Sequence, residues 1–70
     1  MSEIQSILFD KKYWNISKAE RWLHDHHDYP IKEPHVTKNK IRFRLQNPSK
    51  YKRFVTYKLN NGIDLLLGFK

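Results

Sequence analysis

Eight lysine and arginine side chains between Glu33 and Asp64 are the groups in this 70-residue chain best suited to binding an anion, because no acidic residue lies among them. They are Lys38, Lys40, Arg42, Arg44, Lys50, Lys52, Arg53 and Lys58. Residues 38–70 carry nine Lys and Arg against one acidic residue, whereas residues 1–37 carry five against six. Like charges gathered in this way repel each other until an anion neutralises them. The charge pattern therefore favours a polyanion as ligand.

Segment 40–45 reads Lys-Ile-Arg-Phe-Arg-Leu, and this alternation has the period of a strand with one buried face. If its apolar side chains point into the core, Lys40, Arg42 and Arg44 point away from it. Side chains on one face of a strand are about 6.6 Å apart, close to the phosphate spacing along a nucleic-acid strand. Arginine also binds phosphate through two parallel hydrogen bonds. We expect these three residues to be the central contacts to a nucleic-acid backbone, DNA or RNA, without sequence specificity.

The other five cations lie in the turn, connection and strand that adjoin this segment, and they would widen the stripe into a patch. They are Lys38, Lys50, Lys52, Arg53 and Lys58. Tyr51 lies among them and would either stack on a base or cap the edge of the core with its hydroxyl exposed. Two other interpretations of the charge stay open. One is a solvated face that keeps the domain soluble, and the other is a surface for an acidic protein partner.

Glu20, His24 and His27 occupy one flank of the predicted helix at i, i+4 and i+7, which is a weak metal-binding pattern. Histidines are also favoured in a last helical turn by the helix dipole, without any metal. The chain has two glycines, too few for a phosphate-binding loop, and its hydroxyls and carboxylates form no recognisable catalytic set. We therefore expect neither an enzyme nor a cofactor.

The elements that position these side chains are predicted by apolar periodicity as an α+β domain over residues 1–70, in the order β-α-β-β-β-β. One helix packs on a mainly antiparallel sheet of four to five strands. The expected strands are 4–9, 31–37 as a weak edge strand, 41–45, 54–59 and 63–67; the helix runs from 16 to about 27, with Asn15 or Ser17 as N-cap. Asn60, Asn61 and Gly62 supply the left-handed positions of a tight turn, so the last two strands should pair. Strand 63–67 is apolar on both faces, which favours a central place or a partner over Leu66.

The expected core is small, because a chain of this length buries only about 60% of the surface that its unfolded form exposes. Its members are Ile7, Phe9, Trp14, Ala19, Trp22, Leu23, Ile41, Phe43, Leu45, Val55, Tyr57, Leu65 and Leu67. The chain has no cysteine, which excludes disulfides and suits a reducing compartment. It opens without a basic leader ahead of an apolar run, and its apolar stretches are too short to cross a bilayer. We expect a soluble, intracellular protein that is not secreted.

A further pattern is scattered over nearly the whole chain. It consists of Ile7-Leu-Phe9, Lys12-Tyr-Trp14, Lys18-Ala19, Trp22-Leu23, His26 or His27, Thr37-Lys-Asn39, Arg42-Phe-Arg44, Asn47-Pro48, Phe54, Thr56, Asn61-Gly-Ile63 and Gly68-Phe69. This pattern resembles a small domain of unknown function encoded by giant DNA viruses and, in diverged form, by tailed phages. The resemblance implies a viral origin, with the protein acting in the virion or in the infected host cell, and it brings no catalytic residues. An alternative to nucleic-acid binding is a structural or interaction module that packs inside a virion or forms a homo-oligomer through Leu66 and a sheet edge.

Overall fold

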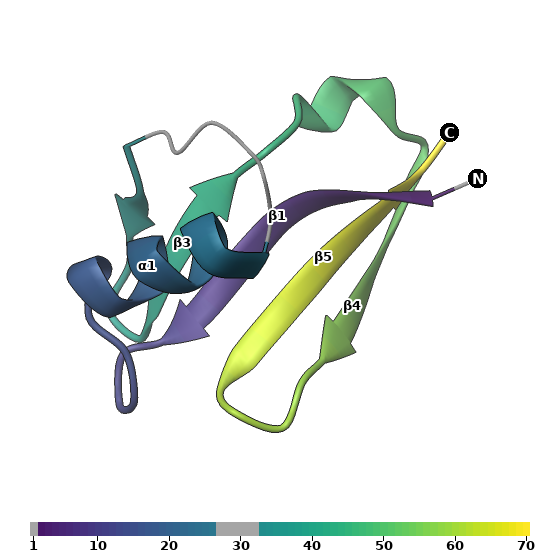
Figure 1. Ribbon diagram of the computed structural model, residues 1–70. Coiled ribbons are helices and arrows are strands. Elements are labelled where there is room, and N and C mark those ends of the chain that lie inside the picture. The colour runs from purple at the N-terminus through teal and green to yellow at the C-terminus, as the bar shows by residue number, and fades with distance from the viewer. Residues whose placement is uncertain (1, 27–32) are drawn as a thin grey trace.

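One helix lies across one face of a five-stranded antiparallel sheet in the computed structural model, which describes residues 2–26 and 33–70 (Figure 1). The elements are β1 (Ser2–Asp10), α1 (Ile16–His26), β2 (His35–Val36), β3 (Lys40–Arg44), the 3₁₀ helix η1 (Pro48–Lys50), β4 (Arg53–Lys58) and β5 (Ile63–Phe69). The strands lie in the order β2-β3-β1-β5-β4, and each neighbouring pair is antiparallel. The α+β class and the helix-on-sheet architecture predicted from the sequence are confirmed.

The helix α1 begins at a side-chain cap. Oδ1 of Asn15 accepts a hydrogen bond from the backbone N–H of Lys18 (2.8 Å), so Asn15 rather than Ser17 is the N-cap. Ala19 and Leu23 are one helical turn apart, and both are buried against the sheet as the helical period predicts. The helix ends at residue 26 within the described chain, and the predicted end at 27 lies outside it.

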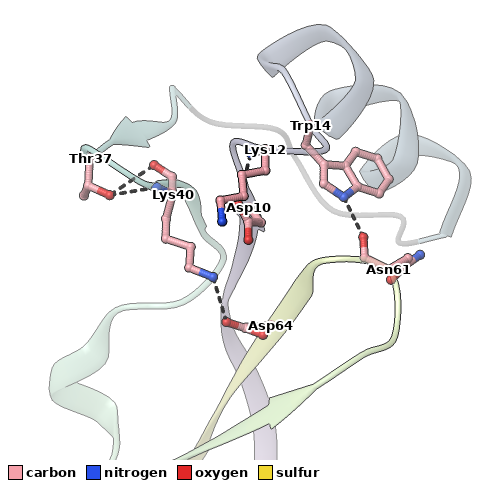
Figure 2. Close-up of polar contacts among 7 residues, drawn as sticks. All are labelled: Asp10, Lys12, Trp14, Thr37, Lys40, Asn61 and Asp64. Atoms are coloured by element: carbon pink, nitrogen blue, oxygen red, sulfur yellow. Dashed lines mark hydrogen bonds and ion pairs between the residues drawn. The ribbon is translucent and has the colours of Figure 1, made fainter.

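Phe9 is the centre of the core. Its ring packs against the rings of Trp14, Trp22 and Phe43, with centroid separations of 5.1, 5.8 and 5.7 Å in tilted or edge-on geometry. The fully buried apolar residues around it are Ile7, Ala19, Leu23, Ile41, Phe43 and Ile63. The indole N–H of Trp14 donates to the backbone carbonyl of Asn61 (2.8 Å), which fastens the segment before α1 to the β4–β5 turn (Figure 2).

Strand β5 occupies a central position between β1 and β4, as its two apolar faces predict. It pairs with β4 through the loop 60–62, so the predicted hairpin is confirmed. Within that loop only Gly62 adopts a left-handed φ (78°), so the left-handed positions expected at Asn60 and Asn61 are wrong. The strand continues to Phe69, beyond the predicted end at Leu67, because it pairs along the whole length of β1 from Ser2 onward. The weak edge strand is shorter than predicted within the described residues, where it spans only His35–Val36.

Val55 and Tyr57 are exposed, with 43% and 58% of their surface accessible, and their predicted place in the core is wrong. Both lie on the helix side of the sheet, since they pair with Leu67 and Leu65. However, α1 lies over the β3 and β1 side of the sheet and leaves β4 uncovered (Figure 1). Alternation along a strand predicts which way a side chain points, but it does not predict whether another element covers it.

Tyr51 covers the end of β5 on the sheet face opposite the helix. It is buried, and its ring lies so close to Gly68 that a Cβ atom added there would be 2.6 Å from Tyr51 Cδ2. Glycine at position 68 therefore makes room for the aromatic ring rather than for an unusual backbone angle.

We predict that Gly68→Ala lowers the free energy of unfolding by about 1–3 kcal/mol, because the added methyl group overlaps the ring of Tyr51. Urea denaturation measures this change. In a Tyr51→Ala background the same substitution should cost less than about 1 kcal/mol, because the overlapping ring is gone. Equal costs in the two backgrounds would contradict this account of the packing.

Candidate nucleic-acid interface

The sheet face opposite α1, called the open face below, carries the central part of the predicted cationic surface. Ile41 and Phe43 are buried on the helix side, so Lys40, Arg42 and Arg44 alternate onto the open face. The structure thus places these three side chains where the sequence alternation predicts them.

Cross-strand neighbours determine what surrounds these cations. Arg42 lies between His35 on β2 and Leu8 on β1. Leu8 is followed on the same face by Asp64 on β5 and then by Lys58 on β4. Lys58 is therefore three strand spacings, about 14 Å, from Arg42. Positive charge lies toward both edges of the open face instead of forming the continuous patch expected from the order of the segments in the chain.

Arg42 is held in place by two polar side chains that are completely buried. Its Nε donates to Ser6 Oγ (3.3 Å) and its Nη2 donates to Gln5 Oε1 (3.4 Å). The Ser6 hydroxyl donates to Gln5 Oε1 (2.6 Å), and Gln5 Nε2 donates to the backbone carbonyl of Gln46 (2.7 Å). Gln5 and Ser6 are the buried polar residues of the described chain, and their position directly beneath an arginine on a solvent-facing sheet is the most specific feature of this face.

A β-bulge produces this arrangement. The pairing of β1 with β5 shifts register between Ile4 and Ser6, which leaves Gln5 as the extra residue. The carbonyl oxygen of Gln5 accepts hydrogen bonds from the N–H groups of Leu45 (2.8 Å) and Gln46 (3.2 Å). Because a bulge turns neighbouring side chains away from strict alternation, the side chains of two consecutive residues can both reach Arg42.

Lys40 is less available than its sequence neighbours suggest. Its Nζ lies 3.3 Å from Asp64 Oδ2, and 35% of its side chain is exposed (Figure 2). Its backbone N–H also donates to the hydroxyl of Thr37 (3.1 Å), which orders the turn between β2 and β3. A half-exposed ion pair contributes only about 0–1 kcal/mol, so an incoming phosphate can compete with Asp64. No acidic residue lies among the eight cations in the sequence, but in the folded sheet Lys40 has the carboxylate of Asp64 as a partner.

A shallow hollow opens beside Arg42 at the β2–β3 edge. It is lined by Glu33, His35, Arg42 and Arg44. Two arginines and a histidine supply several N–H donors to one small volume, which suits an oxyanion, while Glu33 opposes it. His35, Gln5 and Ser6 were missed by the sequence reasoning. The only signal for the last two is a pair of polar residues inside the otherwise apolar segment 4–9.

Two of the remaining predicted cations lie off the stripe. The guanidinium carbon of Arg53 is 4.8 Å from the ring centroid of Phe69, and this pair lies on the helix side of the sheet. Lys38 lines a separate hollow beyond the end of β1, together with Lys11 and Lys12, which the sequence reasoning did not include.

Lys50 and Lys52 lie in the connection that leads to β4. At the end of η1, Lys50 Nζ donates to Gln46 Oε1 (3.2 Å), and both lysines are exposed. Neither belongs to the row formed by Arg42 and its cross-strand neighbours.

Tyr51 is buried, so its ring offers no exposed platform for base stacking. Its hydroxyl donates to Glu3 Oε1 (3.0 Å) in a partly buried contact, so Tyr51 covers the core edge, but its hydroxyl is not exposed as the alternative expected. This hydrogen bond, followed by one from Lys70, holds the pKa of the Glu3 carboxyl below its ordinary value.

The helix-end histidines form no metal centre in the part of the chain that the structure describes. Within residues 2–26 and 33–70, no three His, Cys, Asp or Glu residues are grouped so that they could hold a metal ion. Of the three candidates, Glu20 and His24 lie on α1 and His27 lies outside the described residues. The neighbouring His26 stacks on Trp22, with ring centroids 4.4 Å apart.

Comparison of the chain with protein-family models, curated proteins and solved structures finds no match. The resemblance to a viral domain therefore stays a prediction. In the described residues, every helix is too short or too polar to cross a membrane.

We predict that Ser6→Ala releases Arg42, because the substitution removes the hydroxyl that accepts from Nε and donates to Gln5. The ¹⁵Nε order parameter of Arg42 should fall toward that of the exposed Arg44, and stability should drop by about 1–3 kcal/mol because buried hydrogen bonds are lost. Ser17→Ala, at an exposed helical serine, is the matched control. An Arg42 side chain that stays as ordered in the Ser6 variant as in the parent protein would show that this network does not hold it.

Proposed function

We propose that this protein binds nucleic acid through the phosphate backbone across its open face, without catalysing a reaction. The observation that carries the proposal is the fixed Arg42. Two fully buried polar residues hold its guanidinium between Lys40 and Arg44, on a sheet face that α1 does not cover. Burying the polar side chains of Gln5 and Ser6 is unfavourable unless they gain hydrogen bonds. An arginine that was only solvated would not require two buried polar side chains beneath it.

The remaining donors of Arg42 suit a phosphate. Its Nε and Nη2 atoms face Ser6 and Gln5, which leaves the Nη1 end of the guanidinium for an external oxyanion. Arg44 is exposed on the same face two residues further along β3, a separation of about 6.6 Å. Two arginines at this spacing can each contact one of two successive phosphates.

Backbone contact is favoured over base recognition by the burial of Tyr51. Of the aromatic residues on the open face, Phe54 at the β4 edge is partly exposed, and it is far from β3 in the strand order. In the part of the chain that the structure describes, His35 is the exposed ring beside these cations, and no exposed Phe, Tyr or Trp side chain lies next to them. This arrangement supports binding that depends on charge and spacing rather than on sequence.

Four predicted cations of the open face, Lys40, Arg42, Arg44 and Lys58, define the expected salt dependence. If each neutralises one phosphate of duplex DNA, the logarithm of the binding constant should fall with the logarithm of salt concentration at a slope of about −3.6. The double variant Arg42→Ala/Arg44→Ala should bind more weakly, with a slope of about −1.8 from the two remaining phosphate contacts. Fluorescence anisotropy with a labelled duplex of mixed sequence measures both slopes.

The matched control is Lys18→Ala/Arg53→Ala, which removes the same amount of charge from the helix and from the helix side of the sheet. This variant should keep a slope close to that of the parent protein. A parent slope near zero rules out phosphate contacts as the source of affinity. Equal loss in the two double variants would mean that net charge alone drives binding, and the assignment to the open face would then be wrong.

A further inference from the structure

Strand β4 forms an edge of the sheet and is exposed along its whole length. All six of its residues are exposed, and its pairing with β5 runs without a register shift from Arg53 to Lys58. A straight, regular edge strand presents a row of backbone N–H and C=O groups that a further strand can pair with. Proline, which would interrupt such a row, does not occur in β4.

Apolar side chains accompany this edge on the helix side of the sheet. Val55 and Tyr57 point there and stand beside the half-buried Leu65 and Leu67 of β5. On this face the helix α1 lies over β1 and β3 and leaves β4 uncovered, so these residues form an exposed apolar strip (Figure 1). Such a strip next to an open strand edge is typical of surfaces that accept an extended segment.

Positive charge marks both ends of the same strand. Arg53 and Lys58 are five residues apart, or about 17 Å along the strand. Among the described residues, the ion pairs join Lys40 to Asp64 and Lys70 to Glu3, so neither Arg53 nor Lys58 forms an ion pair, although Asp64 lies opposite Lys58 in the β4–β5 pairing. A partner strand with acidic residues near its two ends would complement this charge.

We infer that β4 binds an extended acidic segment of another protein by strand addition. Backbone hydrogen bonds along β4 supply affinity, apolar side chains at alternate positions cover Val55 and Tyr57, and carboxylates pair with Arg53 and Lys58. This surface lies at the opposite edge of the sheet from β2 and β3, and Lys58 is the one residue that it shares with the proposed nucleic-acid contacts.

A second copy of the chain fits this edge less well. Each copy carries a net charge of +7, so two copies repel each other. Antiparallel pairing of β4 with itself keeps each sheet face on one side, so it sets Arg53 opposite Tyr57 or Phe54 opposite Lys58, and it brings no carboxylate to either cation. Charge complementarity therefore selects an acidic partner over a homodimer.

The test uses a fluorescein-labelled synthetic peptide, acetyl-Glu-Glu-Val-Thr-Val-Thr-Val-Glu-Glu-amide, titrated with the purified protein and followed by anisotropy. We expect saturable binding. Methylating the amide nitrogens of the valines blocks one edge of the peptide, and methylating those of the threonines blocks the other. Only one of these two series should weaken binding, by about tenfold or more, because strand addition uses one peptide edge. A peptide with lysine in place of each glutamate should also bind at least about tenfold more weakly.

A pair of tyrosine variants locates the site on the protein. Tyr57→Ser should weaken binding of the acidic peptide by about fivefold or more, whereas Tyr13→Ser, at a tyrosine that is 65% exposed outside β4, should leave it unchanged. Absence of binding, equal binding of both methylated series, or equal binding of the lysine peptide overturns the inference. So does a protein that sediments as a dimer and cross-links through Thr56→Cys, because a second copy would then occupy β4.

Discussion

One helix of 11 residues cannot cover both faces of a five-stranded sheet, and the rest of the structure depends on this limit. Such a helix is about 16 Å long, whereas five strands span about 19 Å from the first to the last. The core therefore forms only where α1 lies, around Phe9. Apart from the buried residues Gln5, Ser6, Tyr51 and Gly68, the open face and the helix side of β4 are in contact with water or with a partner.

The open face meets this requirement with side chains that are polar but not free to move. The bulge at Gln5 brings two consecutive polar residues under Arg42, and each buried polar side-chain atom in the described chain has a hydrogen-bond partner. Burial without partners would cost about 1–3 kcal/mol for each group. In this network the buried groups of Gln5 and Ser6 are hydrogen-bonded, and the same hydrogen bonds fix the Arg42 side chain. The guanidinium is therefore positioned in advance for a ligand.

The sequence predicts the direction of a side chain on its strand better than it predicts which strands lie next to each other. Alternation in segment 40–45 correctly predicts that three cations point away from the core. The residues of the loop 60–62 correctly predict that the strands on either side of it pair. The order of strands across the sheet is not contained in such local patterns, because β1, the first strand, inserts between β3 and β5. For this reason Lys58 lies far from Arg42, and Val55 and Tyr57 lie beyond the helix. The bulge depends on pairing with β5, so the role of Gln5 could not be predicted from β1 alone.

Asp64 lowers the repulsion among the cations of the open face in a chain with a net charge of +7. Asp64 pairs with Lys40 and lies between Leu8 and Lys58 in the sheet, so it screens the middle of the face. Arg42 has neutral hydrogen-bond partners instead of a carboxylate, so no ion pair offsets its positive charge. A phosphate would have to displace Asp64 to reach Lys40, but it would meet no such competitor on Ser6 or Gln5. Among the described residues, Arg42 and Arg44 form no ion pair, so the attraction of β3 for an anion is stronger at these two residues than at Lys40.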